Sequence, residues 1–228
     1  MPEKILIVED EKAIQMILKT YLENAGYDVE LANDGLEGIS KFQRGTYDLV
    51  LLDVMIPKID GYVVLEMIRN ESNTPVMMLT ALEKDQDQMK AFDLQADDYI
   101  IKPFKMGIVL RRIEAVLRRR LTIKDADLNR ELLTYGDLSV DLKRCEVFVS
   151  GELIPLTKKE FELLALLLEK QDQVFSREMI LEKLWGYDFY GNSKVVNTHV
   201  QHLRRKLGGD YIEAVRGIGY KFSKKNEQ

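Results

Sequence analysis

The chain has 228 residues, a formal net charge of −5 and a single cysteine, Cys145. One cysteine excludes a disulfide framework and a thiolate metal cage, and it is typical of a reducing compartment. The longest apolar run covers residues 163–168, far below the ~20 residues needed to span a bilayer. Carboxylates stand where a signal peptide would need apolar residues. We therefore expect a cytoplasmic protein that does not associate with membranes.

The charge is distributed unevenly along the chain. Residues 1–120 hold 16 basic and 21 acidic side chains, whereas residues 121–228 hold 17 of each, and the part from Ser176 onward holds 10 basic and 6 acidic. Such asymmetry indicates that the two halves do different work. The negative net charge of the whole chain therefore does not exclude nucleic acid as a partner. Length and composition predict a domain over 1–120, a polar linker over 121–132 and a second domain over 133–228.

Short apolar runs typical of buried strands recur through the first half, at 5–8, 29–31, 49–52, 76–79 and 99–101. Residues with helical periodicity fill the gaps between these runs. Strands that alternate with helices at this spacing predict a five-stranded parallel sheet covered on both faces. Because parallel crossovers are right-handed, the expected arrangement is a doubly wound α/β fold.

The second half has a different pattern. Strand patterns lie at 138–140 and 145–149, helical patterns at 158–170, 177–185 and 195–207, and a hairpin pattern at 211–222 turns near Gly217. Thr157 and Glu160 form a capping-box signature at the start of the first helix. Short strands, three helices and a closing hairpin predict a winged helix-turn-helix domain.

Polar functional groups follow four of the five predicted strands of the first half: Glu9 and Asp10, Asp53, Thr80 and Lys102. Ligands of an open parallel sheet bind outside the carboxyl ends of its strands. Each residue alone is more simply a helix cap or a polar strand end, but together they indicate one site. Three neighbouring carboxylates repel one another unless a hard cation lies between them, and oxygen ligands favour Mg²⁺. Mg²⁺ beside a carboxylate and a lysine suits phosphoryl transfer, with Asp53 as the nucleophile.

The chain resembles OmpR/PhoB-type two-component response regulators. The segments that carry the resemblance are ILIVEDE, LLDVMIP, LTA and ADDYIIKPF in the first half and GDLSV, LTKKEFELL, REMILEKLWG and VRGIGYKF in the second. They follow the family's order over nearly the whole chain. The resemblance implies a flavodoxin-like (βα)5 receiver domain followed by a winged helix-turn-helix DNA-binding domain, and thus a regulator instead of an enzyme.

By this resemblance, Asp53 is the phosphoacceptor and a sensor histidine kinase is the phosphodonor. The implied ligands of Mg²⁺ are Glu9, Asp10, Asp53 and the backbone carbonyl of Met55. Lys102 would contact the phosphoryl group and precede a cis peptide bond to Pro103. Thr80 and Tyr99 are the implied switch residues.

The resemblance also implies a homodimer on activation, formed through a surface that contains Asp97, Asp98, Arg112 and Arg119. Gln88 and Ile108 stand where many members carry a basic–acidic pair across this surface. Since Gln and Ile cannot form that ion pair, the dimer would be weaker, more apolar or less dependent on phosphorylation.

The helix predicted at 195–207 is the candidate DNA-reading element. The residues expected to contact DNA are Thr198, His202, Arg204 and Arg205 on this helix, Lys194 directly before it, and Arg216 in the hairpin. The helix alone could equally be a solvated basic face, but the preceding helix and the hairpin favour insertion into the major groove. Histidine makes one base contact where the family's frequent arginine makes two, so the base preference stays open. Promoter DNA and RNA polymerase are the implied partners.

Two other functions fit parts of the sequence. One is an Asp-nucleophile phosphatase that acts on small molecules. Such enzymes often carry a second Asp as general acid two residues after the nucleophile. This chain has Met55 at that position, which counts against a phosphatase. The other alternative is a DNA-binding regulator whose receiver is constitutively dimeric and independent of phosphorylation.

Overall fold

The computed structural model describes residues 2–81, 85–117, 132–171, 173–186, 189 and 192–223. The chain divides into two compact units, residues 1–117 and 118–228. The linker predicted at 121–132 lies outside the described residues, apart from Leu132. No helix in the described ranges is both long and apolar enough to cross a membrane.

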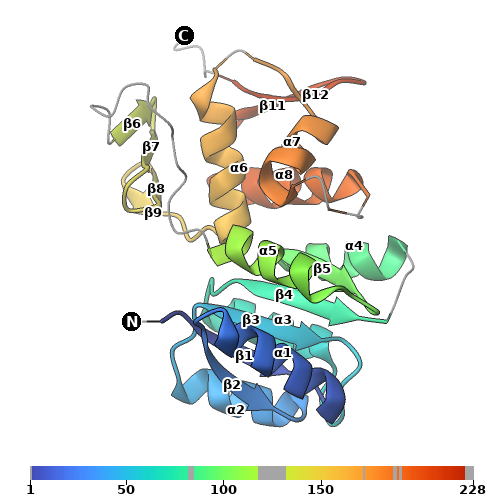
Figure 1. Cartoon of the computed structure of the whole chain (residues 1–228). Coiled ribbons are helices and arrows are strands. Elements are labelled where there is room, and N and C mark those ends of the chain that lie inside the picture. Colours follow the sequence, from blue (N-terminus) through green and yellow to red (C-terminus); the bar gives the residue numbers. More distant parts are fainter. Residues whose placement is uncertain are drawn as a thin grey trace. The chain divides into compact units, whose positions relative to one another are not determined.

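The first unit is a parallel sheet with helices on both faces (Figure 1). Its strands are β1 (Lys4–Val8), β2 (Asp28–Ala32), β3 (Leu49–Asp53), β4 (Val76–Thr80) and β5 (Asp98–Ile101), in the order β2-β1-β3-β4-β5. Its helices are α1 (Lys12–Asn24), α2 (Gly35–Arg44), α3 (Gly61–Glu71), α4 (Asp85–Asp93) and α5 (Met106–Leu117). The predicted doubly wound α/β fold is confirmed.

The strands of this sheet are apolar on both sides because helices cover both faces. Ile5 and Ile7 of β1 are fully buried in a cluster with residues of α1 and α5. Val8 points to the opposite face, where α2 packs closely: a Cβ added at Gly38 would lie 2.9 Å from a Val8 methyl. Because all five strands run parallel, their carboxyl ends lie along one edge of the sheet.

The second unit contains two antiparallel sheets and three helices. The first sheet has β6 (Leu132–Tyr135), β7 (Leu138–Asp141), β8 (Glu146–Val149) and β9 (Glu152–Leu153), and the second has β10 (Phe175–Ser176), β12 (Gly219–Phe222) and β11 (Ile212–Val215). The helices are α6 (Lys158–Glu169), α7 (Arg177–Trp185) and α8 (Lys194–Leu207), and α6 contacts both others. The three predicted helices and the closing hairpin are present. Strands β9 and β10 were not predicted, because two residues are too few to show periodicity. Strand β6 was also missed, although it is as long as β7; its first residue, Leu132, falls in the predicted linker.

A buried capping box joins the start of α6 to the end of α8. The Glu160 backbone N–H donates to the Thr157 hydroxyl (3.4 Å), and the Glu160 carboxylate accepts from the Thr157 backbone N–H (2.7 Å). The same carboxylate is fully buried and accepts from the Lys206 ammonium at 2.7 Å. Since a buried charge without a partner is strongly destabilising, this pair ties α6 to α8.

We expect Thr157→Ala to lower the free energy of unfolding of the second unit by about 1 kcal/mol, because the substitution removes an N-cap hydrogen bond. The single tryptophan, Trp185, lies in α7, so its fluorescence during urea unfolding reports on this unit. The matched control is Ser193→Ala, since Ser193 occupies the N-cap of α8 without a side-chain capping bond. Equal losses in the two variants would contradict this role of Thr157.

Candidate functional site

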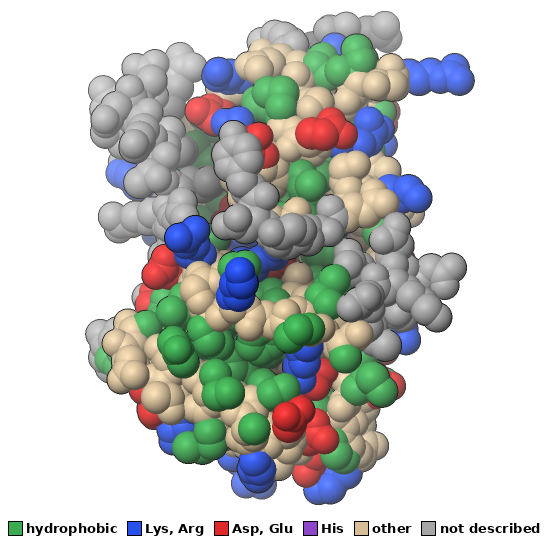
Figure 2. Space-filling view, turned by 45° about the vertical axis from the view of Figure 1, so that its right-hand side comes forward, with side chains coloured by type: hydrophobic (Ala, Val, Ile, Leu, Met, Phe, Trp, Pro, Cys, Tyr) green, Lys and Arg blue, Asp and Glu red, His purple; other side chains and the backbone are tan. Residues whose placement is uncertain are grey.

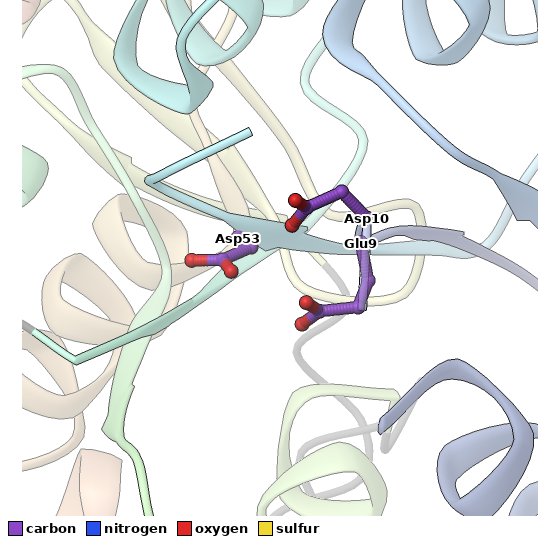
Figure 3. A group of neighbouring side chains, drawn as sticks. All are labelled: Glu9, Asp10 and Asp53. Atoms are coloured by element: carbon purple, nitrogen blue, oxygen red, sulfur yellow. The ribbon is translucent and has the colours of Figure 1, made fainter. Parts of the chain in front are cut away.

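Three carboxylates lie together at the carboxyl edge of the parallel sheet (Figure 3). Glu9 and Asp10 follow β1, and Asp53 is the last residue of β3. One oxygen from each lies within 4.8 Å of the others; Glu9 and Asp53 are buried, whereas Asp10 is exposed. A set of oxygen donors with one side open to solvent fits Mg²⁺, which binds through few carboxylates and keeps several waters.

The Lys102 ammonium lies between two of these carboxylates. Its Nζ is 2.6 Å from Glu9 Oε2 and 2.6 Å from Asp53 Oδ2. The residue follows β5, its backbone N–H donates to the Thr80 carbonyl (2.6 Å), and its peptide bond to Pro103 is cis, as the resemblance implies. The positive charge of Lys102 thus offsets the repulsion between Glu9 and Asp53.

Burial and charge set the protonation of this cluster. Burial disfavours the charged form of Lys102, but hydrogen bonds to Asp53 and Glu9 outweigh it and raise the pKa of the ammonium above its ordinary value. Burial also raises the pKa of Glu9, a rise that the hydrogen bond from Lys102 opposes and the charge of Asp53 increases. A lysine that stays protonated provides a positive charge beside Asp53, where phosphoryl oxygens would approach.

The loop between β3 and α3 packs tightly around Asp53. The Met55 backbone N–H donates to Asp53 Oδ1 at 3.2 Å, and the Met55 side chain is 64% exposed. A Cβ added at Gly61, the first residue of α3, would lie 2.1 Å from the Asp53 carbonyl oxygen, an approach that only glycine permits. The structure thus brings Met55 to the site through its amide, and its predicted role as a carbonyl ligand of Mg²⁺ stays a prediction.

The turn between β2 and α2 anchors the two loops that carry the carboxylates. The buried Gln15 amide donates to the carbonyl of Ala32, at the end of β2 (3.0 Å), and to that of Glu9. On the other side, the Asp34 carboxylate accepts from the Lys58 ammonium of the β3–α3 loop at 2.6 Å. The β2–α2 turn therefore holds both loops, although it adds no carboxylate to the cluster.

Glu37 closes this turn from the first turn of α2. Its Oε2 accepts from the Asn33 backbone N–H (2.8 Å) and side-chain amide (2.7 Å), and its Oε1 lies 2.8 Å from Lys41 Nζ. Chiefly because of Lys41, and also because of Asn33, the pKa of Glu37 is lowered to about 2. The ionised carboxylate is thus the form that stabilises the turn.

A lowered folded-state pKa means that Glu37 stabilises the first unit fully above its unfolded pKa of about 4.3, and that this contribution is lost as the pH falls toward 2. We expect Glu37→Gln to lower the free energy of unfolding at pH 7 by about 0.5–1 kcal/mol, after allowance for solvent screening at this partly exposed site. By pH 3 the difference should fall to less than half. Thermal unfolding of both proteins by circular dichroism tests this, and a difference independent of pH would contradict it.

The two predicted switch residues are buried near this edge. Thr80 is fully buried at the end of β4, the strand that pairs with β3. Tyr99 on β5 is 5% exposed, and its ring centroid lies 6.5 Å from that of Phe92 on α4. Thr80 therefore lies one strand away from Asp53, and Tyr99 lies on the strand that leads to Lys102.

Three of the residues predicted for the dimer surface, Asp97, Asp98 and Arg112, are buried and form ion pairs within the first unit. Asp97 accepts from Arg69 Nη2 (2.7 Å) and from the Val76 backbone N–H (2.9 Å), and Asp98 accepts from Arg112 Nη1 (2.7 Å). Their pairing between two chains stays a prediction. Of the others, Ile108 is partly buried on α5, and the Gln88 side chain and Arg119 lie outside the described residues.

Helix α8 carries an exposed polar stripe with one residue per turn: Lys194, Asn197, Gln201 and Arg205. Thr198 and His202, which were predicted to contact DNA, are buried instead, at 6% and 7% exposed. Asn197 and Gln201 were missed as candidates, although their spacing from Lys194 marks them as residues of one helix face.

The hairpin of β11 and β12 is tied to α8 by Arg204. Its Nε and Nη2 both donate to the Ile212 carbonyl, at 3.1 and 2.7 Å, and its guanidinium lies 5.8 Å from the centre of the Tyr220 ring. Arg216 is exposed beside Gly217, whose φ of +76° forms the turn. Of these two arginines, Arg204 therefore connects the helix to the hairpin, and Arg216 is accessible to a ligand.

A phosphoacceptor-like cluster on one unit and a winged helix-turn-helix on the other define a regulator with a receiver and a DNA-binding domain. Residues 5–114 match the family described as "Response regulator receiver domain", and residues 151–222 match "Transcriptional regulatory protein, C terminal". The chain belongs to the OmpR/PhoB-type DNA-binding response regulators of two-component systems.

Relatives resemble the chain over nearly its full length. Regulatory protein VanRB of Enterococcus faecalis is 42% identical over 97% of this chain and 98% of its own, and ResD of Bacillus subtilis is 39% identical over 96% and 95%. Among solved structures, DrrB of Thermotoga maritima is 33% identical with a TM-score of 0.53, over 98% of this chain and 100% of its own. A mutant of RitR is 30% identical with a TM-score of 0.74, over 97% and 99%.

Proposed function

We propose that this chain is a cytoplasmic transcription regulator that a sensor histidine kinase switches by phosphorylating Asp53 in a Mg²⁺-dependent reaction. The main observation that supports this proposal is that Glu9, Asp10, Asp53 and Lys102 meet at one edge of the sheet. The Lys102 ammonium lies 2.6 Å from both buried carboxylates. The chain then acts as a regulator and not as an enzyme on small molecules.

In the proposed reaction, an Asp53 carboxylate oxygen attacks the phosphorus of a phosphohistidine. A P–O bond forms and the P–N bond breaks, and its electron pair stays on the imidazole nitrogen, which takes up a proton. Lys102 stabilises the negative phosphoryl oxygens, and Glu9, Asp10, Asp53 and the Met55 carbonyl would hold Mg²⁺. When bound, this ion supplies further charge neutralisation at the same oxygens.

A protein phosphodonor is supported by an exposed apolar face beside the acidic cluster. Met16, Ile17 and Tyr21 of α1 are about half exposed, at 55%, 49% and 51%, and α1 begins two residues after Asp10. Hydrophobic side chains gather on the face of the receiver drawn in Figure 2. Contiguous exposed apolar side chains are typical of protein interaction surfaces, which favours a kinase over a small-molecule phosphate as the physiological donor.

In the proposed switch, the Thr80 hydroxyl moves toward the phosphoryl oxygens and the Tyr99 ring follows. Two receivers then pair through the surface predicted for the dimer: Gln88, Asp97, Asp98, Ile108, Arg112 and Arg119. Asp97, Asp98 and Arg112 are buried and form ion pairs within the receiver, so their proposed role in the dimer is to set register and partner choice.

The dimer would bring two DNA-binding domains to promoter DNA, with RNA polymerase as a further partner. The proposed DNA contacts are Lys194, Arg205 and Arg216, because Thr198 and His202 are buried and Arg204 donates to the Ile212 carbonyl of the hairpin. Arg205 and Lys194 are supported by their exposure on α8, and Arg216 by its exposure at the hairpin turn. Contacts from such residues to phosphates position the protein without selecting a sequence.

Incubation with phosphoramidate and Mg²⁺ should add the mass of one phosphoryl group to the intact protein and tighten its binding to promoter DNA. We expect no mass gain for Asp53→Ala or after chelation of Mg²⁺. Asp60→Asn is the matched control, because Asp60 caps α3 in the same loop. We expect this variant to be phosphorylated on Asp53 as the wild-type protein is. An unmodified wild-type protein whose DNA binding does not change would contradict the proposal.

The alternative of a phosphorylation-independent dimer is favoured by Gln88 and Ile108, and light scattering during size exclusion decides between the two. We expect wild-type protein to be monomeric before phosphorylation and dimeric after it. Ile108→Glu should weaken the phosphorylated dimer at least tenfold, because it puts a carboxylate where an apolar contact is proposed. If Asp53→Ala is dimeric and binds DNA as tightly as phosphorylated wild-type protein, the alternative holds instead.

A further inference from the structure

Resting on the DNA-binding function above, we propose that Asn197 is a specificity-determining residue that presents only hydrogen-bond donors to DNA. It would then select guanine at one position of each half-site instead of the adenine that a free asparagine favours. The inference comes from the two internal hydrogen bonds that occupy its carbonyl oxygen.

Both hydrogen bonds end on the same atom. Arg177 Nε donates to Asn197 Oδ1 at 2.8 Å, and the Tyr220 hydroxyl donates to Oδ1 at 2.9 Å. A carbonyl oxygen has two lone pairs, and arginine has donors but no acceptor. The arginine therefore fixes which branch of the amide is oxygen, and both acceptor positions of Asn197 are in use within the protein.

The surrounding contacts hold the amide in this orientation. The Arg177 guanidinium lies 5.2 Å from the centre of the Tyr220 ring, and Arg204 lies 5.8 Å from the same ring. Arg177 Nη1 also reaches the Ile218 carbonyl at 3.5 Å. The start of α7, the side of α8 and the hairpin thus form one network around Asn197 Oδ1, which opposes a flip of the amide on DNA binding.

Asn197 is placed to meet base edges. It is exposed, and it is the fourth residue of α8 on the polar stripe between Lys194 and Gln201. The N-terminal part of a recognition helix is the part that contacts bases in the major groove. The amide nitrogen, with its two N–H groups, is therefore the group that Asn197 offers to DNA.

A donor-only amide has a definite base preference. In the major groove guanine presents two acceptors, thymine one, and cytosine a donor. Asparagine pairs with adenine by donating to N7 and accepting from N6, and the second of these bonds needs the oxygen that Arg177 and Tyr220 occupy. Guanine can therefore accept the most hydrogen bonds from the Asn197 amide. Cytosine presents an N–H donor at this edge and can accept none.

The test is selection of binding sites from a random DNA pool by the full-length, phosphorylated protein. Wild-type protein should enrich guanine about tenfold at one position per half-site, since guanine alone presents two acceptors to the amide N–H groups. Asn197→Asp should replace guanine by cytosine there, because its free oxygen is an acceptor. Tyr220→Phe should raise adenine at that position, because it frees one lone pair of Oδ1 while keeping the ring.

Gln201→Glu is the matched control, since it makes the same amide-to-carboxylate change one turn further along α8 and should leave this position unaltered. If wild-type protein prefers adenine at the position that Asn197→Asp changes, or if no position changes in that variant, the inference is wrong. If the wild-type protein selects no sequence at all, the proposed DNA-binding function fails and not the assignment of Asn197 alone.

Discussion

Repulsion among Glu9, Asp10 and Asp53 is the constraint on which the receiver's architecture depends. Carboxylates this close cannot all stay ionised in a buried setting without a compensating positive charge. The fold supplies it from the far end of the sheet, because the parallel arrangement brings Lys102 after β5 to the same edge as β1 and β3. The strand order therefore produces the charge balance, since it places the Lys102 ammonium 2.6 Å from both Glu9 and Asp53.

The second unit meets a similar constraint inside its helical core. Lys159 is 2% exposed, yet its ammonium contacts the Glu162 carboxylate (2.9 Å), the Leu184 carbonyl and the face of Trp185. Next to it, Glu160 is paired with Lys206. Burying charges costs free energy unless each has partners, so these contacts specify how α6 packs on α7 and α8. Both units thus use buried charges to define where their elements meet.

Features that depend on residues close together in the sequence could be predicted, and features that depend on residues far apart could not. Strands β1 to β5 and the residues after them were predictable, because apolar runs and their ends are local features. The ties made by Gln15 and by Asp34 with Lys58 were not, because they join residues distant in sequence and depend on tertiary packing. Likewise, the periodicity of α8 groups residues by face but does not say which face is covered. Thr198 was therefore expected at the surface and is buried.

The bonds from Arg204 to the Ile212 carbonyl have a mechanical consequence. Together with the network around Asn197, they hold α8 and the hairpin in a fixed position relative to each other. In the proposed complex, the helix and the hairpin would contact two adjacent DNA grooves at a fixed separation. Sequences whose minor groove already has a matching width and position would need little deformation to bind. The domain would then respond to the shape of base pairs that no side chain touches.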